Sequence, residues 1–246
     1  MFALWNDLLN LIFPPAPECP FCGRPGPPGK ACGNCLAYLE GFRREAHCSR
    51  CGRLPGKGAA LFGRGGTRLC GECRAREWPF ALVRAAGPYE GIIKEAIHRF
   101  KYAGRRGLAA PLAALMAEAA RAEPLLAADL ILPVPLAGEK LRHRGFNQAA
   151  LLAGEVGALL RVPVDRRVLV KIVETPSQAG LTRPARQTNL EGAFKVINAG
   201  KVCGRKVLVV DDVFTTGSTM SAAAAALTAA GAARVSGLTV AAARFF

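Results

Sequence analysis

Aromatic and acidic side chains are both scarce in this sequence, and each scarcity restricts the kind of protein it encodes. Aromatic residues make up 7% of the 246 residues, which favours layers of helix and sheet over a binding surface built on aromatic rings. Lysine and arginine outnumber the acids 33 to 18, giving a formal net charge of +15. This surplus favours polyanionic ligands such as pyrophosphate, phosphosugars or nucleic acid, although a basic surface also serves solubility.

Long hydrophobic runs and export signals are missing as well. Residues 1–13 are apolar but lack a basic start and carry Asp7, unlike a secretory signal. The stretch is also shorter than the about twenty residues that a membrane-spanning helix needs. Its apolar residues share one helical face ahead of Pro14-Pro15, which predicts an amphipathic helix packed on the protein, with membrane contact as the lesser alternative. We expect a cytoplasmic protein with no stable membrane span.

Composition divides the chain at Trp78-Pro79. Residues 1–77 are expected to form a small module, because residues 14–77 are rich in Cys, Gly, Pro and Arg and need a cross-link or a metal to fold. Residues 78–246 alternate strand-like and helix-like patterns, which predicts an α/β domain with a doubly wound parallel sheet. The expected strands are 80–86, 129–135, 167–173, 207–210 and 235–243, and the expected helices are 92–100, 111–121, 148–160 and 220–230.

Eight of the nine cysteines form four Cys-x-x-Cys pairs. Two thiolates three residues apart in a tight turn can bind one ion, and Gly23 and Gly52 permit the left-handed backbone that such a turn requires. Two pairs supply the four sulfurs of a closed zinc tetrahedron. The predicted ligands of two structural zinc ions are Cys19, Cys22, Cys32, Cys35, Cys48, Cys51, Cys70 and Cys73.

The spacing leaves the pairing order open. Sequential pairing gives one site over residues 19–35 and another over 48–73, whereas interleaved pairing also fits. Disulfides would need an oxidising compartment, and iron–sulfur clusters usually have more closely spaced cysteines. Redox activity would suit one pair beside a thioredoxin-like unit, and not four pairs in a segment rich in Gly and Pro. Cys203 is interpreted as an ordinary thiol, and His47 as a spare ligand that four complete pairs make unnecessary.

The segment 207–219 carries the clearest indication of a ligand. An apolar strand ends at Asp211 and Asp212, and a turn rich in hydroxyls and glycine then opens a helix. Amides at a helix start bind phosphate, while paired acids suit the hydroxyls of an attached sugar. A buried strand before a capped helix would not explain the paired acids. The predicted binding residues of the turn are Thr215, Thr216, Gly217, Ser218 and Thr219.

Two basic stretches supply further candidates. Residues 132–136 follow a predicted strand and precede clustered cations, which suit pyrophosphate because arginine pairs bidentately with its oxygens. Residues 175–194 are polar and basic, as a lid over an anionic site would be. Taken alone, each stretch is better explained as a solvated basic loop. Their candidate contacts are Pro133, Val134, Pro135, Lys140, Arg142, Arg144, Arg183 and Arg186.

Segment 207–219 closely resembles the signature of the phosphoribosyltransferases. With the cysteine pairs, the chain is similar to the ComF family of competence-associated proteins, which have an N-terminal zinc ribbon. The resemblance spans nearly the whole chain and includes the runs Phe100-Lys101-Tyr102-x-Gly104 and Arg144-Gly145-Phe146-Asn147-Gln148. It implies a double zinc-ribbon module over 1–77 and a phosphoribosyltransferase-like domain over 78–246.

The resemblance also implies roles for individual residues. Asp211 and Asp212 would hold the ribose hydroxyls of phosphoribosyl pyrophosphate, the turn its 5′-phosphate, and Lys101 the pyrophosphate, with magnesium bound alongside. Asp211, Asp212, Arg142 and Arg144 would form the catalytic group. Thr215 stands where purine-transferring relatives carry a third acid, so purine salvage is not favoured.

Two functions stay open at this stage. One is a phosphoribosyltransferase of the glycosyltransferase class. The other is a non-catalytic accessory of DNA uptake that handles single-stranded DNA with competence-machinery proteins and uses phosphoribosyl pyrophosphate as a ligand.

Overall fold

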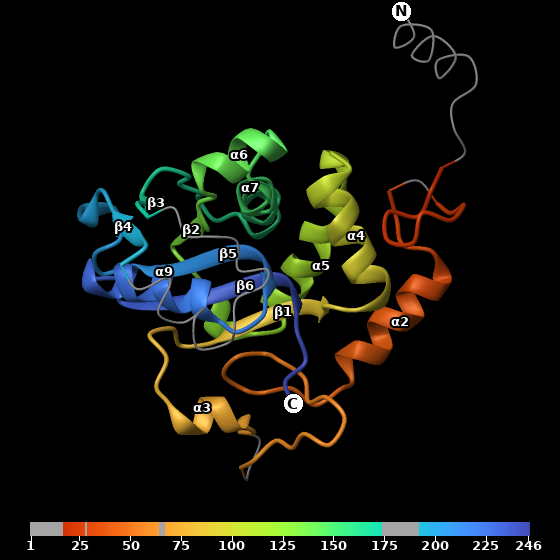
Figure 1. Ribbon diagram of the computed structural model, residues 1–246, viewed down its shortest axis with the longest axis horizontal. Helices are drawn as coiled ribbons and strands as arrows, with labels where there is room; N and C mark the ends of the chain where they lie inside the picture. The colour runs from red at the N-terminus through yellow and green to blue at the C-terminus, as the bar shows by residue number, and fades with distance from the viewer. Residues whose placement is uncertain (1–16, 28, 64–66, 174–191) are drawn as a thin grey trace, which may run out of the picture.

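The computed structural model describes residues 17–27, 29–63, 67–173 and 192–246. Its main sheet has four strands in the order β1-β6-β5-β2, and every neighbouring pair is parallel (Figure 1). The strands are β1 (Val83–Pro88), β2 (Leu130–Pro133), β5 (Lys206–Phe214) and β6 (Arg234–Ala242).

Helices cover both faces of this sheet, as a doubly wound fold requires. Leu208 and Val210 of β5 belong to a buried cluster with one group of helices, whereas Val207 and Val209 belong to a second cluster with α9. The alternation follows from the two-residue period of a strand. The helices of the first group are α4 (Gly91–Tyr102), α5 (Ala109–Arg121) and α7 (Gln148–Leu160), and α9 spans Ser218–Ala229. The predicted α/β architecture is confirmed.

Shorter elements connect or extend these layers. Strands β3 (Leu169–Lys171) and β4 (Phe194–Val196) form a separate antiparallel pair. The strand expected at 167–173 is therefore present in part, but outside the main sheet. The short helices described after residue 78 are η1 (Arg106–Leu108), η2 (Pro124–Leu126), α6 (Gly138–Arg144) and η3 (Ala199–Lys201).

The cysteine-rich segment packs against the larger domain. Helices α2 (Gly33–Arg43) and α3 (Gly71–Ala75) begin directly after Cys32 and Cys70, which serve as their N-caps. Cysteines 19 and 35 share a buried cluster with α4, whereas cysteines 48, 51, 70 and 73 share the cluster on the opposite face. The C-terminal segment also contacts the cysteine-rich segment, because the amide of Gly56 donates to the carbonyl of Phe245 over 2.7 Å. Neither group of cysteines thus has a core of its own.

Two predicted features lie outside the described residues: the amphipathic helix over 1–13 and most of the proposed lid, including Arg183 and Arg186. Among the helices that are described, none combines the length and the apolar character needed to cross a bilayer.

Candidate functional site

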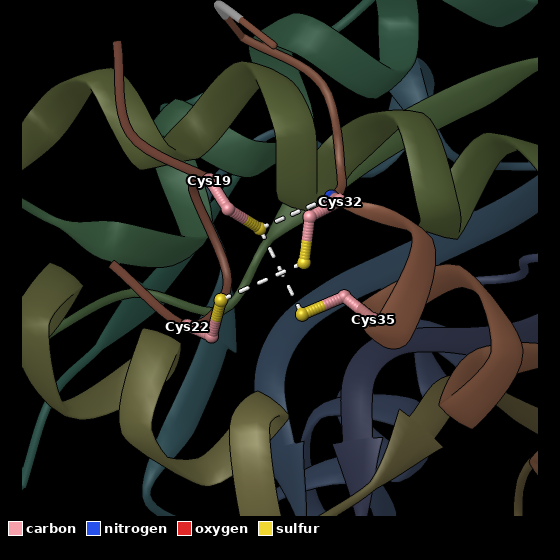
Figure 2. Close-up of side chains that lie close together, drawn as sticks. All are labelled: Cys19, Cys22, Cys32 and Cys35. Carbon is pink, nitrogen blue, oxygen red and sulfur yellow. Dashed lines mark hydrogen bonds between the residues drawn. The ribbon is translucent and has the colours of Figure 1, made fainter. Parts of the chain in front are cut away.

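The cysteines form two groups of four that follow the order of the sequence. In the first group, Cys19, Cys22, Cys32 and Cys35, all four Sγ atoms lie within 4.8 Å of one another. Figure 2 shows them pointing toward a common centre. The sulfurs of Cys19 and Cys35 are 3.7 Å apart, and those of Cys22 and Cys32 are also 3.7 Å apart. The fold therefore adopts the sequential pairing.

The second group repeats this local geometry with deeper burial. It consists of Cys48, Cys51, Cys70 and Cys73. The amide of Cys70 donates to the sulfur of Cys48 over 3.4 Å, as the amide of Cys32 does to Cys19 over 3.3 Å. Gly23 and Gly52 have φ values of 72° and 68°, so the predicted left-handed turns are confirmed.

The sulfur separations fit a tetrahedral zinc ion at each group. Zinc–thiolate bonds are about 2.3 Å long, so the edge of a regular tetrahedron of sulfurs is about 3.8 Å. Two pairs of sulfurs in the first group are 3.7 Å apart, and the sulfurs of Cys51 and Cys70 in the second are 3.8 Å apart. All nine cysteines lie in the described part of the chain and none forms a disulfide. Both groups thus fit structural zinc, and Cys203 is exposed and apart from them.

A cavity of about 280 Å³ opens at the carboxyl edge of the main sheet. Its walls come from the ends of β5 and α4, from the segment after β2, from α6, and from the β3–β4 pair. Cations and acids both line it. The cations are Lys101, Lys140, Arg144 and Lys171, and the acids are Asp211 and Asp212.

Lys101 and Asp212 form an ion pair inside this cavity. Nζ of Lys101 lies 2.9 Å from Oδ2 of Asp212, and the two side chains are 13% and 14% exposed. Burial by itself would lower the pKa of Lys101, but the charge of Asp212 and its hydrogen bond outweigh burial and raise this pKa above its ordinary value. Lys101 therefore stays protonated at neutral pH.

Asp211 has a perturbed protonation equilibrium. Burial and the neighbouring charge of Asp212 raise the pKa of Asp211 to about 7, although the amide of Asp212, Lys101 and Arg144 each act to lower it. The amide of Asp212 donates to Oδ1 of Asp211 over 2.8 Å. A carboxyl group in this state gives up its proton readily when a cation or a hydroxyl donor arrives.

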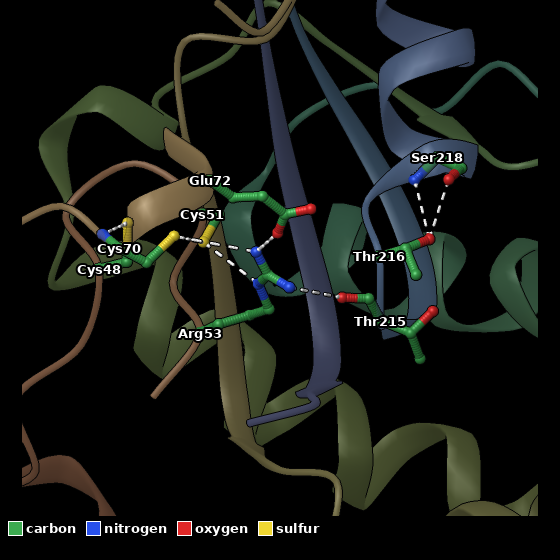
Figure 3. A network of polar contacts seen from close by, with 8 residues as sticks. All are labelled: Cys48, Cys51, Arg53, Cys70, Glu72, Thr215, Thr216 and Ser218. Atoms are coloured by element: carbon green, nitrogen blue, oxygen red, sulfur yellow. Dashed lines mark hydrogen bonds and ion pairs between the residues drawn. The ribbon is translucent and has the colours of Figure 1, made fainter. Parts of the chain in front are cut away.

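The turn after β5 leads directly into α9. Gly217 has φ 80° and is the N-cap of α9, with no side chain capping the helix. The hydroxyls of Thr216 and Ser218 lie 2.9 Å apart, and the amide of Ser218 donates to Oγ1 of Thr216 over 3.4 Å (Figure 3). The amides of a helix start and the positive end of the helix dipole make this turn suitable for an anion. Thr215 and Thr219 also line the cavity, which joins the turn to the acid pair.

Some of the other predicted residues line the cavity and others do not. Val134, Pro135, Lys140 and Arg144 line the cavity, whereas Pro133 ends β2 and Arg142 is exposed on α6 outside the lining. Arg144 is held in place, because it donates to Oε1 of Gln148 over 3.2 Å and to the hydroxyl of Tyr102 over 3.4 Å.

Sequence reasoning missed several lining residues. Tyr89 and Lys171 reach the cavity from the ends of β1 and β3, whereas Phe194, which reaches it from β4, is the last residue of the proposed lid segment. Tyr89 follows the carboxyl end of β1 in the parallel sheet, which is where ligands bind in open α/β sheets. That rule would have indicated Tyr89, whereas the position of the β3–β4 pair has no local sequence signal.

Comparisons with known proteins agree with this arrangement. A family model described as a double zinc ribbon domain matches residues 8–74, and one described as a phosphoribosyl transferase domain matches residues 147–244. Competence protein F of Haemophilus influenzae is 29% identical over 77% of this chain and 80% of its own length. DNA utilization protein YhgH of Salmonella typhimurium is 32% identical over 82% of this chain and 87% of its own length.

A solved glutamine phosphoribosylpyrophosphate amidotransferase from B. subtilis has a TM-score of 0.39 and 20% identity, over 57% of this chain and 30% of that chain. A structural similarity this low gives no information about the residues of the site. The fold, the paired cysteine sites and the family matches define a phosphoribosyltransferase-like protein with a double zinc ribbon. Since YhgH is 32% identical over most of both chains, and competence protein F is related over a similar length, the chain belongs to the ComF family.

Proposed function

We propose that this chain binds phosphoribosyl pyrophosphate together with magnesium at the carboxyl edge of the main sheet. One observation carries the proposal: a single cavity brings Asp211 and Asp212, the cations Lys101 and Arg144, and the turn before α9 together. Each part of the ligand has a complement there. The diphosphate matches the cations, the ribose hydroxyls match the carboxylates, and the 5′-phosphate matches the amides of the turn.

The acid pair also has the chemistry that magnesium prefers, because Mg²⁺ takes oxygen ligands and is commonly held by one or two carboxylates plus phosphate oxygens. When bound, magnesium would neutralise part of the charge of the diphosphate. Lys101 would then exchange its ion pair with Asp212 for one with the ligand. Arg144 is already oriented by Gln148 and Tyr102, so its guanidinium loses little freedom on binding.

If the protein catalyses transfer, the bond between C1 of the ribose and pyrophosphate breaks and pyrophosphate leaves with the electron pair. A nucleophile on the acceptor forms the new bond to C1. Lys101 and Arg144 would stabilise the charge on the leaving group, and the turn would fix the sugar. Among the described lining residues, the only carboxylates are Asp211 and Asp212. Catalysis would therefore depend on positioning and charge stabilisation, without a dedicated carboxylate base for the acceptor.

Calorimetric titration with phosphoribosyl pyrophosphate and magnesium tests the binding. Asp212→Asn should weaken binding at least tenfold, which corresponds to the loss of one charged contact. Asp165→Asn is a matched control, because Asp165 is also largely buried and paired with a lysine, Lys201, but lies outside the cavity. Equal affinities for the Asp212→Asn variant and the wild type would refute the proposed site.

A second function follows from the relatives and from the charge. The names of two relatives refer to competence and to DNA utilization, and the chain carries a formal net charge of +15. We propose that the protein acts in DNA uptake in the cytoplasm, with the module over 1–77 and the domain over 78–246 each contributing one role. Binding to a fluorescent single-stranded oligonucleotide should weaken steeply as salt rises from 50 to 200 mM, as expected for contacts to phosphates. Salt-independent or absent binding would remove this role.

A further inference from the structure

Arg53 lies between the second cysteine group and the phosphate turn. It follows Cys51 by two residues, yet its side chain contacts a residue 162 positions further along the chain. Nε donates to the sulfur of Cys51 over 3.5 Å, and Nη2 donates to the sulfur of Cys70 over 3.8 Å. Nη1 donates to the carbonyl oxygen of Thr215 over 3.4 Å (Figure 3).

The surroundings of Arg53 fix its position. The residue is only 2% exposed, and its guanidinium also forms an ion pair with Glu72 of α3. The guanidinium lies 6.0 Å from the ring centre of Phe214 and 5.9 Å from that of Phe245. A buried guanidinium needs partners for its donors, and a rigid fork cannot keep all of them if one group moves. The sulfurs and the turn are therefore held as one unit.

The contact with Thr215 bears on the direction of the turn's peptide groups. In a trans peptide the N–H points opposite to the C=O. Since Arg53 holds the carbonyl of Thr215, the amide of the following residue, Thr216, points away from the zinc ribbon. Trp78 limits movement from another side, because a Cβ added at Gly217 would lie 2.9 Å from its ring. Arg53 thus supports the orientation of amides that a phosphate would use.

The first cysteine group has no such connection among the described residues. Arg99 of α4 connects it to the larger domain by donating to the carbonyls of Pro20 and Phe21, and Arg105 pairs with Glu18, but neither arginine contacts the turn in the described structure. The two zinc sites are therefore unequal with respect to the ligand.

We propose that Arg53 is a positioning residue that couples the second cysteine site to the phosphate turn, so that the metal at this site sets the affinity of the turn for a phosphate monoester. With zinc bound, four thiolates and one divalent ion carry a net charge of about −2, which attracts the guanidinium. Without the metal, the four sulfurs lose their common ligand and the guanidinium loses a charged partner, so the support of the turn is weakened. This inference rests on the proposed function, in which the turn binds the 5′-phosphate.

The affinities of three ligands distinguish a positioning role of Arg53 from a general loss of structure in its variants. Ribose 5-phosphate and phosphoribosyl pyrophosphate carry the 5′-phosphate, whereas magnesium pyrophosphate does not. Arg53→Met should weaken the first two by up to about tenfold, the loss expected if the full free energy of the charged hydrogen bond to the Thr215 carbonyl serves to orient the turn, and change binding of magnesium pyrophosphate less than twofold. Arg53→Lys keeps the charge but not the fork, so it should show the same selective loss.

Arg84→Met is the matched control. Arg84 donates to the carbonyl of Ser49 in the same ribbon over 2.9 Å and pairs with Glu123, but it does not reach the turn. It should leave the affinity for ribose 5-phosphate unchanged. If Arg53→Met binds ribose 5-phosphate as the wild type does, or weakens all three ligands equally, the inference is wrong. If the wild type binds none of the three, the proposed function fails instead.

Hydrogen exchange measured by mass spectrometry tests the coupling without any ligand. Arg53→Met should speed exchange of the amides in the peptide covering residues 214–220. Cys73→Ser, which removes a ligand of the second site, should do the same, whereas Cys22→Ser at the first site should not. Metal analysis verifies that each cysteine variant has lost one zinc. Equal exchange at residues 214–220 in the wild type, Arg53→Met and Cys73→Ser would overturn the coupling.

Discussion

Acidification from pH 8 to pH 6 should weaken the binding of phosphoribosyl pyrophosphate with magnesium, because Asp211 gains a proton over this range. Burial and the charge of Asp212 raise its pKa to about 7 in the free protein. Magnesium and the ribose hydroxyls prefer the ionised carboxylate, so the pKa falls when the ligand binds. A group whose pKa is lower in the complex releases a proton on binding, and the affinity consequently rises with pH.

The size of the effect follows from the ionised fraction. A carboxyl group with this pKa is about 10% ionised at pH 6 and about 90% ionised at pH 8. If the ionised form binds ten or more times more tightly than the protonated form, the apparent affinity follows that fraction closely and changes about five- to tenfold between the two pH values. At pH 7, binding should release about half a proton.

Calorimetry in buffers of different ionisation enthalpy measures both the affinity and the number of protons released. The ligand's phosphates also titrate, with a pKa of about 6, so the control is Asp211→Asn, which keeps the ligand but removes the carboxyl group. The wild type should have the steeper pH dependence. If the wild type and Asp211→Asn show the same slope and release the same number of protons, the reasoning about Asp211 is wrong.

Three further outcomes are expected. Gly217→Ala should lower the free energy of unfolding in urea by about 1–3 kcal/mol, because Gly217 has φ 80° and an added Cβ would meet Trp78 and Phe214. Gly41→Ala, in α2 with nothing within 4 Å of its Cβ position, should leave the free energy of unfolding unchanged or raise it. If Gly41→Ala lowers the free energy of unfolding more than Gly217→Ala does, the argument from the conformation of Gly217 is wrong. Elemental analysis should find two zincs per chain, and chelation should lower the Tm; an unchanged Tm in the metal-free protein would exclude a structural role. Lys101→Met should weaken magnesium pyrophosphate at least tenfold and ribose 5-phosphate less than threefold, with Lys201→Met as the control, and equal losses for both ligands would argue against a diphosphate contact.

The sequence predicted most of the larger domain because its elements have strong periodicity. The helix expected at 148–160 has those bounds in the structure, and the strand expected at 235–243 is shifted by one residue. The strand at 207–210 is longer than expected, because β5 continues through the two acids to Phe214. Parallel pairing with β6 stabilises this extension, because Asp211 lies opposite Thr239 and Phe214 opposite Ala242, and a local pattern that stops at the first acid does not contain that information.

Other elements had no adequate signal. Helix α2, Gly33–Arg43, lies in a segment in which we expected little periodicity, and α6 lies in a stretch interpreted as a basic loop. The cysteine spacing identified the ligands but not their order. The order depends on how each ribbon packs against the sheet, and sequential pairing places the two groups on opposite faces.

The candidate site was predicted as residue types rather than as contacts. Asp211 and Asp212 were indicated by the strand and turn around them, but the ion pair of Asp212 with Lys101 joins segments 111 residues apart. Arg53 had no local signal, since its role depends on a carbonyl 162 positions away. Contacts of this kind arise from tertiary packing, which one sequence does not specify.

The most direct test of the central claim is a crystal structure of the protein with phosphoribosyl pyrophosphate and magnesium. Density for the diphosphate should lie within hydrogen-bonding distance of Lys101 and Arg144, with the 5′-phosphate at the amides of residues 215–219 and the ribose hydroxyls at Asp211 and Asp212. Ligand density at another place on the protein, or a cavity without ligand at millimolar concentration, would contradict the assignment of this edge of the sheet.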